Sequence, residues 1–91
     1  MNITLEEFLT PEALPTMGKR IRALRRYAGM TQRALAVTIN TSVSTVASYE
    51  NDRHTPRVDI VYRLADALGT SFAFLVCLTD NPSPDTNYIK E

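Results

Sequence analysis

Serine or threonine stands immediately before each of four segments whose apolar residues repeat at helical spacing. These residues are preferred N-caps, because their side-chain oxygen accepts a hydrogen bond from a free amide of the first helical turn. The predicted caps are Thr16, Thr31, Ser42 and Ser71. No stretch of the chain shows the convincing apolar–polar alternation of a half-buried strand. The sequence therefore predicts an all-α fold built from short helices.

We expect a compact bundle of five main helices whose ends are set by capping residues, glycine and proline. They are placed from near Thr16 to Gly29, between Thr31 and Asn40, from Val43 to about Glu50, from Pro56 to Gly69, and from Phe72 to about Leu78. A short extra helix is expected from Thr4 to Leu9, because Thr4 and Glu7 have capping-box spacing. The apolar run at 72–78 is also compatible with a strand.

A chain of 91 residues is long enough for one domain. We expect an acidic N-terminal extension at residues 1–15, the folded domain at 16–79, and a flexible tail at 80–91, where the sequence is polar and interrupted by proline. The chain has no apolar run near the ~20 residues of a membrane span, and its start is unlike a signal peptide. A soluble, intracellular protein is therefore expected.

Charge is unevenly distributed, although the whole chain has a formal net charge of +0. Residues 16–63 hold nine of the ten basic side chains and only three acidic ones, whereas the segments on either side are acidic. A basic region between acidic ends is where a polyanion would bind. The alternative is that these charges belong to ordinary solvated helix faces.

Catalytic and metal-binding patterns are missing from the sequence. Cys77 and His54 are the single cysteine and the single histidine, so an internal disulfide and a zinc site of several thiolates are excluded. No phosphate-binding loop, metal motif or catalytic carboxylate pair occurs. We expect no metal, no cofactor and no enzymatic activity, and we interpret Cys77 as a small packing residue.

One ordered pattern spans the second and third expected helices. It consists of Thr31-Gln32, Leu35-Ala36, Asn40, Ser42, Val46, Tyr49-Glu50 and Pro56. The pattern resembles the phage-repressor/Cro-like (Xre-type) helix-turn-helix family, and the resemblance covers roughly residues 17–82. It implies the fold of a phage repressor DNA-binding domain. It also implies a sequence-specific transcriptional regulator, acting as a repressor, in the cytoplasm and encoded by a bacterium or a phage.

Two positions depart from the resembled pattern. Asn40 stands in place of the usual turn glycine, and Asp52 stands in place of the glycine after the third helix. Asparagine and aspartate tolerate a positive φ better than most residues, so we expect the backbone of both turns to be retained.

The resemblance implies that the third helix, from about Val43 to Glu50, enters the major groove of DNA. The residues that would read base edges are Val43, Ser44, Ala47 and Ser48. Serine hydroxyls bond several base edges, and small apolar side chains can contact thymine methyl groups. We expect modest direct readout, with DNA shape or a dimeric site adding specificity. The alternative is that these are simply small surface residues.

Polar residues around this helix would contact DNA phosphates. Gln32, at the start of the second helix, can reach a phosphate and can also brace the third helix. The other residues expected in this role are Arg33, Thr45, Asn51, Arg53 and His54. For loop charges such as Arg53 and His54, the alternative is plain solvation.

The resemblance also implies contacts that hold the domain and its partner copy together. Members of the resembled family often join an arginine of the first helix to the glutamate ending the third, so Arg25 and Glu50 are expected to form a structural ion pair. The fifth helix has more apolar residues than one core stripe requires. We therefore expect Phe74 and Leu78 to form a homodimer contact, because two copies are the usual way to bind two half-sites of double-stranded DNA.

A second hypothesis is a protein-interaction module, such as an antitoxin or a repressor-partner subunit, with secondary DNA binding. Its protein partner would be bound by the acidic N-terminal or C-terminal segment. The neutral net charge and the lack of long polar side chains for base readout favour this hypothesis. Salt dependence separates the two, because DNA binding weakens as salt rises.

Overall fold

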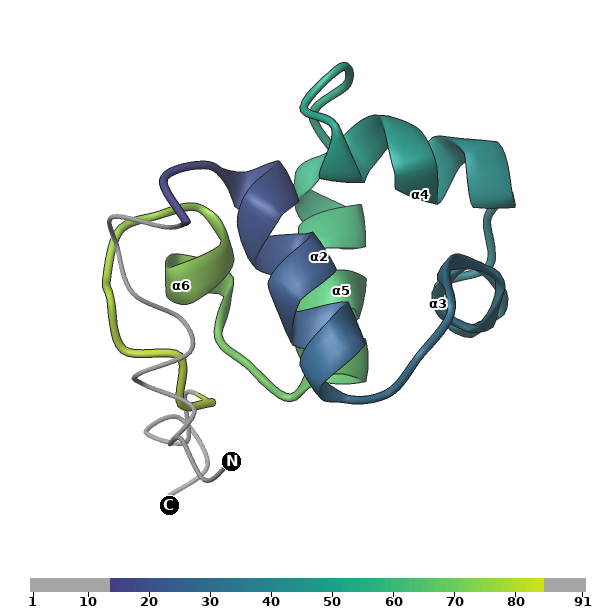
Figure 1. Cartoon of the computed structure of the whole chain (residues 1–91). Helices are drawn as coiled ribbons and strands as arrows, with labels where there is room; N and C mark the ends of the chain where they lie inside the picture. Colours follow the sequence, from purple (N-terminus) through teal and green to yellow (C-terminus); the bar gives the residue numbers. More distant parts are fainter. Residues whose placement is uncertain (1–13, 85–91) are drawn as a thin grey trace.

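The computed structural model describes residues 14–84, which form five helices and no strand. With the labels of Figure 1, they are α2 (Met17–Tyr27), α3 (Gln32–Thr38), α4 (Val43–Glu50), α5 (Val58–Leu68) and α6 (Phe72–Leu75). The predicted all-α, five-helix fold is confirmed, and the strand alternative for 72–78 is wrong. The predicted helix from Thr4 to Leu9 lies outside the described residues. None of the described helices is long and apolar enough to cross a membrane.

Hydroxyl caps begin four of these helices, as predicted. The side-chain oxygens of Thr16, Thr31, Ser42 and Ser71 each accept a hydrogen bond, at 3.0–3.2 Å, from the amide three residues further on. The predicted start of α5 at Pro56 is wrong by two residues. Arg57 keeps an extended backbone, with ψ at 161°, so helical geometry begins at Val58.

Turns with left-handed backbone separate the helices. Asn40 and Asp52 have φ values of 61° and 58°, so both turns keep the backbone that glycine would adopt, as predicted. Gly29 and Gly69 follow α2 and α5 with φ values of 74° and 68°. Cys77, with φ at 66°, also takes this conformation and is exposed. The prediction that Cys77 is a packing residue is therefore wrong.

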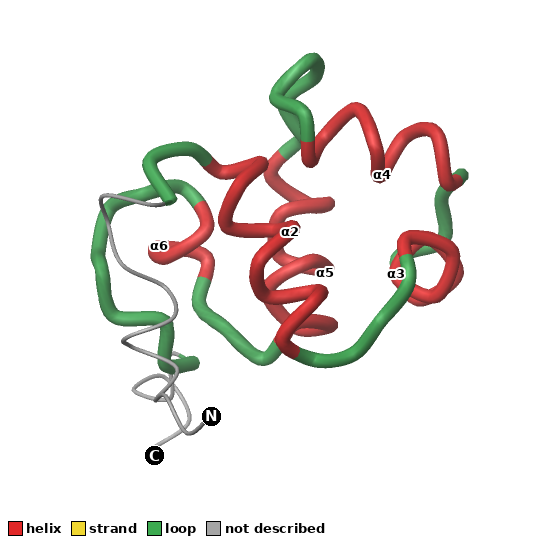
Figure 2. Tube along the Cα trace, in the orientation of Figure 1, coloured by secondary structure: helices red, strands yellow, loops and turns green. Residues whose placement is uncertain are grey.

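The helices enclose one apolar core. In Figures 1 and 2, α2 and α5 lie next to each other at the centre, α6 lies on one side of them, and α3 and α4 lie on the other. α2 contacts α4, α5 and α6, whereas α3 packs mainly on α4. The largest side chains buried in this core are Phe74, Ile21, Leu35, Ile39, Leu64, Leu75 and Val46. The core thereby fixes α4 relative to the rest of the domain.

The last helix differs most from its prediction. α6 ends at Leu75 instead of reaching Leu78, because Val76 caps it and Cys77 turns left-handed. Phe74 is only 1% exposed and packs under the guanidinium of Arg20, which lies 4.3 Å from the centre of its ring. A dimer contact at Phe74 is therefore wrong for this fold. Leu78 remains available, with 78% of its surface exposed.

The packed chain continues past the predicted boundary at residue 79. Pro82 is buried, and its carbonyl oxygen accepts a hydrogen bond from the Thr70 hydroxyl at 2.6 Å. Leu14, placed in the predicted N-terminal extension, is also buried in the core. The other parts of the two predicted terminal segments, residues 1–13 and 85–91, lie outside the described residues.

Candidate nucleic-acid interface

A tight turn joins α3 to α4. Ile39 caps the end of α3 and is buried, Asn40 has a left-handed backbone, and the amide of Thr41 donates to the carbonyl of Ala36 at 2.8 Å. Ser42 then caps α4. With Leu35 and Val46 both fully buried, this turn holds the two helices as one unit.

The two sides of α4 have different surroundings. Val46 and Glu50 are buried against the domain. Among the four residues predicted to read bases, Ser44 is exposed and Val43, Ala47 and Ser48 are half-buried. Val43 also packs partly against the core. Ser44, Ala47 and Ser48 thus share the accessible side, Val43 lies at its edge, and base contact stays a prediction for all four.

A cleft of about 680 Å³ opens beside α4. Four residues with predicted DNA contacts line it, namely Ser44, Thr45, Ser48 and His54. Its other wall comes mainly from α5 and the preceding loop, and consists of Tyr49, Thr55, Arg57, Asp59, Ile60 and Arg63. Arg57 and Arg63 are cations at this cleft that sequence reasoning did not select. No motif marks them, since only the fold brings α5 beside α4.

The predicted ion pair between Arg25 and Glu50 is formed, and it anchors the end of α4 to α2. Nε of Arg25 lies 2.6 Å from Oε2 of Glu50, and Nη2 lies 3.1 Å from Oε1. The Glu50 side chain is completely buried. A two-pronged, charge-assisted contact of this kind fixes direction as well as distance. The exposed side of α4 is therefore held in a set orientation.

Two further side chains support Glu50. Nε2 of Gln32 donates to Oε1 of Glu50 at 3.0 Å, so Gln32 braces α4 as predicted, while its contact with a phosphate stays a prediction. Nε of Arg22 lies 3.5 Å from the same oxygen, and its Nη2 donates to Oδ1 of Asn51 at 3.1 Å. Sequence reasoning missed Arg22, which links the end of α4 to the polar loop after it.

The contacts of Glu50 lower the pKa of its carboxyl group. Burial alone would raise the pKa of this carboxyl, but hydrogen bonds from Arg25 and Gln32, with the charges of Arg25 and Arg22, together hold the pKa below its ordinary value. A lowered folded-state pKa means that the unfolded chain binds the proton more tightly. The contribution to stability is therefore present above the ordinary carboxyl pKa and is lost as the pH falls through the lowered one.

Asp52 fixes the first turn of α2, at the end of the helix opposite to Arg25. The sequence did not reveal this role. Its Oδ1 accepts from the amide of Gly18 at 2.9 Å, and its Oδ2 accepts from the Thr16 hydroxyl at 2.7 Å. Glycine is required at position 18, because a Cβ there would overlap the carbonyl oxygen of Tyr49. Aspartate in the left-handed turn thus compensates its backbone strain with two hydrogen bonds that glycine could not make.

The remaining residues with predicted phosphate contacts lie at the surface. Arg33, Arg53 and His54 are exposed, and among residues 14–84 none of them forms an ion pair with an acidic side chain. The Thr45 hydroxyl lies 2.8 Å from the hydroxyl of Ser42 at the start of α4. Their charges and hydroxyls are accessible to a ligand, and phosphate contact stays a prediction for each.

Known proteins resemble this chain in sequence and fold. Residues 21–75 match the helix-turn-helix family. An immunity repressor protein of Bacillus phage phi105 is 38% identical over 61 residues, which cover 67% of this chain and 42% of the phage protein. The chain therefore spans less than half the length of that relative. An uncharacterized HTH-type transcriptional regulator of Sinorhizobium fredii is 38% identical over 64 residues, covering 70% of this chain and 83% of the regulator.

A solved structure shares the fold. The P22 c2 repressor protein, crystallised in complex with a synthetic operator in the presence of Tl⁺, superposes with a TM-score of 0.66 and 30% sequence identity. The superposition covers 67% of this chain and 92% of that one.

Proposed function

Because the chain belongs to the helix-turn-helix family, we propose that it is a sequence-specific DNA-binding transcriptional regulator that acts as a repressor. One observation carries this proposal. The small hydroxyl and methyl side of α4 is accessible, while the buried pair of Arg25 and Glu50 fixes the opposite side to α2. The solved structure with the similar fold is a repressor in complex with a synthetic operator, which supports the same role here. Family membership also favours a regulator over an enzyme.

In this proposal α4 enters the major groove, and its accessible side faces the base edges. Ser44 and Ser48 offer hydroxyls that bond several bases, and Val43 and Ala47 offer methyl groups to thymine. Gln32 and Arg33, at the start of α3, would lie against the phosphate backbone. Thr45, Asn51, Arg53 and His54 would contact the backbone around α4.

Two copies would bind together in this proposal. One α4 reads a short half-site, and a two-fold pair of copies reads two half-sites separated by about one helical turn of DNA. The dimer doubles the number of contacts, which compensates for the weak discrimination by serine hydroxyls at each half-site.

Salt titration of duplex binding tests the DNA-binding proposal. The logarithm of the binding constant should fall linearly with the logarithm of salt concentration, with a slope of about 0.9 per phosphate contacted. Arg33→Ala should weaken binding to all sequences alike and reduce the slope by about 1 per DNA-bound copy, because one phosphate contact is lost. Arg26→Ala is the matched control, because Arg26 is an exposed arginine of α2 that lines neither side of the α4 cleft.

The DNA-binding proposal is contradicted if binding is absent or independent of salt, which would favour a protein-interaction module instead. An equal effect of the two arginine substitutions would contradict the assignment of Arg33 alone. Substituting both Ser44 and Ser48 with alanine should change the preferred sequence, and an unchanged preference would remove these serines from the base-reading surface.

A further inference from the structure

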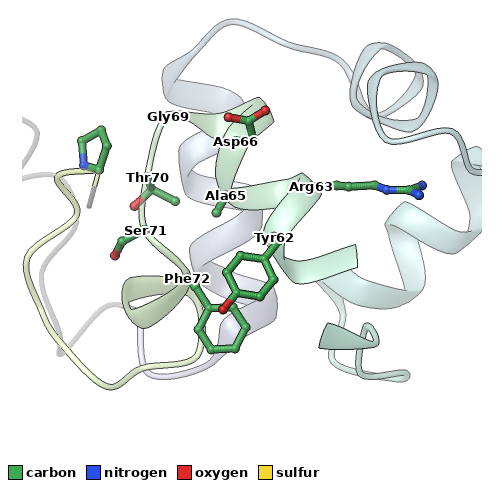
Figure 3. A pocket seen from close by; sticks show the side chains of 9 residues that line it. Tyr62, Arg63, Ala65, Asp66, Gly69, Thr70, Ser71 and Phe72 are labelled. Carbon is green, nitrogen blue, oxygen red and sulfur yellow. The ribbon is translucent and has the colours of Figure 1, made fainter. Parts of the chain in front are cut away.

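An apolar surface on α5 has no covering among the described residues. Val58 and Tyr62 lie one turn apart, with 62% and 59% of their surfaces exposed. The ring of Tyr62 stacks on Phe72 of α6, with the two centroids 4.6 Å apart (Figure 3). A hollow of about 680 Å³ lies beside the stacked rings, and its lining includes Ala65 and Gly69. We call Val58, Tyr62 and Phe72 the α5 ridge.

Opposite charges run along the same helix beside the ridge. Asp59 and Arg63 are both exposed and lie four residues apart, which is the same spacing as Val58 and Tyr62. Residues at this spacing point in the same direction from a helix. The exposed face of α5 thus carries an apolar edge, Val58 and Tyr62, and a charged edge, Asp59 and Arg63.

We infer that the α5 ridge is the contact between two copies of this chain, packed with their α5 helices antiparallel about a two-fold axis. The axis would pass beside α5 midway between Val58 and Tyr62. Val58 of each copy then packs on Tyr62 of the other, and Asp59 of each copy faces Arg63 of the other. A two-fold contact requires this reciprocity, in which residue i meets residue j and j meets i.

The charge pattern is the reason for choosing a second copy as the occupant. A face with opposite charges four residues apart is complementary to itself when the partner helix runs in the reverse direction. The contact then sets each Asp59 against Arg63 of the other copy, which fixes the register. It also buries the apolar edge, and this burial is the main driving force of association. Arg57 already holds both carboxylate oxygens of Asp59 within one copy, at 3.2 and 3.0 Å. This pair is exposed and contributes little to stability, so Arg63 of the partner copy can compete for the same carboxylate.

The inferred pairing fits the proposed function, on which its biological meaning rests. Asp59, Ile60 and Arg63 line the cleft beside α4, so the charged edge of α5 is also a wall of the candidate DNA interface. A two-fold axis perpendicular to α5 keeps the charged edges of both copies on one side of the pair. Both α4 clefts therefore open on that same side, where a single duplex could meet them.

Sedimentation equilibrium of the full chain without DNA tests the inference, with Val58→Asp compared against Leu78→Asp. Aspartate suits the first residue of a helix, so Val58→Asp should leave α5 folded, as circular dichroism would verify. We expect the dimer dissociation constant to rise about tenfold or more for Val58→Asp and to stay unchanged for Leu78→Asp. The inference is overturned if the wild type is monomeric throughout, or if only Leu78→Asp weakens the dimer.

A charge exchange tests the antiparallel register. Asp59→Arg places two arginines opposite each other in its own homodimer, and Arg63→Asp places two aspartates opposite each other, so each variant alone should dimerise more weakly. A mixture of the two variants should form a heterodimer about as stable as the wild type, because every facing pair is again of opposite sign. Failure of the mixture to associate more tightly than either variant alone would overturn this register.

Two controls distinguish the α5 ridge from the end of the chain and from the DNA interface. Pro84 lines the hollow beside the ridge, so a chain ending at Pro84 should dimerise as the full chain does. Loss of the dimer in that shortened chain would assign the contact to residues 85–91 and overturn the inference. Because association is measured without DNA, absent DNA binding would contradict the proposed function while leaving the dimer result standing. An unaltered dimer in Val58→Asp would contradict only the α5 ridge.

Discussion

Arg25→Ala is expected to lower the free energy of unfolding by about 3–5 kcal/mol, which is the usual cost of removing one partner from a buried ion pair. The substitution leaves the carboxylate of Glu50 buried, with its side chain completely shielded from solvent and both hydrogen bonds from Arg25 lost. Gln32 and Arg22 remain nearby and offset part of the loss. Urea denaturation followed by circular dichroism measures the change.

Arg26→Ala is the matched control for this measurement. It removes the neighbouring arginine of the same helix, which is exposed, and should change stability by no more than about 0.5 kcal/mol. Replacing both Arg25 and Glu50 with apolar residues of similar size should cost less than Arg25→Ala, because no charge is then left buried alone. Arg25→Ala with the stability of the wild type would show that the pair does not hold α4.

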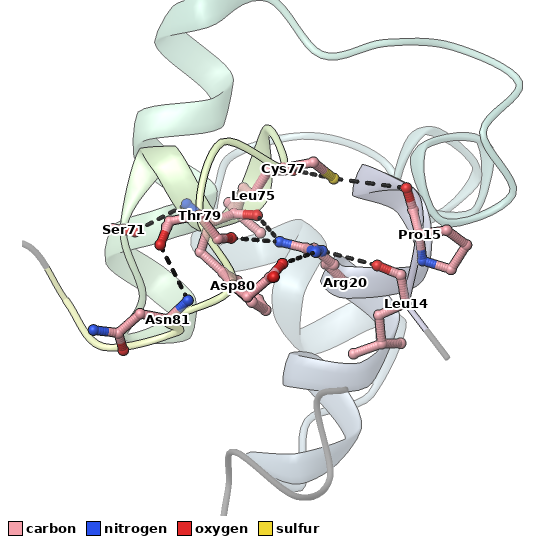
Figure 4. A network of polar contacts seen from close by, with 10 residues as sticks. Leu14, Pro15, Arg20, Ser71, Leu75, Cys77, Thr79, Asp80 and Asn81 are labelled. Atoms are coloured by element: carbon pink, nitrogen blue, oxygen red, sulfur yellow. Dashed lines mark hydrogen bonds and ion pairs between the residues drawn. The ribbon is translucent and has the colours of Figure 1, made fainter. Parts of the chain in front are cut away.

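Arg20→Met is expected to destabilise the domain by about 2 kcal/mol or more, at about 1–3 kcal/mol for each acceptor left without a donor, because the carbonyls of Leu14 and Thr79 lose theirs while Phe74 keeps the amide of Cys77. The guanidinium of Arg20 donates to the carbonyl oxygens of Leu14, Phe74 and Thr79 at 2.8–2.9 Å. It also reaches Asp80 at 3.2 Å (Figure 4). One side chain thus connects the entry of the chain into α2, the short helix α6, and the exit from the domain.

Methionine keeps much of the apolar stem of Arg20 but not its guanidinium, so the variant separates the hydrogen bonds and the ring contact of the guanidinium from the packing of the stem. Asp80→Asn is the control, since Asp80 is mostly exposed and its pair with Arg20 should contribute little. Thermal and urea denaturation should both show the loss for Arg20→Met. Equal stabilities of Arg20→Met and Asp80→Asn would contradict the role of the three carbonyl contacts.

Local sequence signals predicted most of the helix boundaries. Each of the four hydroxyl caps acts on an amide only three residues away, so the cap and its partner lie in the same short window. The left-handed turns at Asn40 and Asp52 are equally local, because they depend on the backbone preference of one residue. The pairing of Arg25 with Glu50 was predicted from the resemblance alone, across 25 residues of sequence.

Contacts between distant segments escaped prediction. Nothing in the sequence singles out Arg20 among the arginines of its helix, yet three backbone carbonyls accept hydrogen bonds from it, two of them more than 50 residues away. No pattern in the sequence shows where such carbonyls will meet. The hydrogen bond from the Gly18 amide to Asp52 was missed for the same reason, since the two residues are 34 positions apart.

The predicted dimer contact failed for a geometric reason. Phe74 and Leu78 would share one face only if a helix continued through both residues. The left-handed backbone of Cys77 follows the end of the helix at Leu75, so Phe74 turns into the core and Leu78 turns out to solvent. The exposed apolar pair lies on α5 instead, where Val58 and Tyr62 are set out at true helical spacing.

The central claim is that the side of α4 carrying Ser44, Ala47 and Ser48 lies against the edge of a DNA duplex. A nuclear magnetic resonance titration of the full chain with duplex DNA tests it most directly, by following each backbone amide as DNA is added. We predict that the largest shifts fall on α4 and on the first turn of α3, with little change at α6. Shifts confined to α6 and the residues that follow it, or no shift on α4 when DNA binds, would contradict the claim.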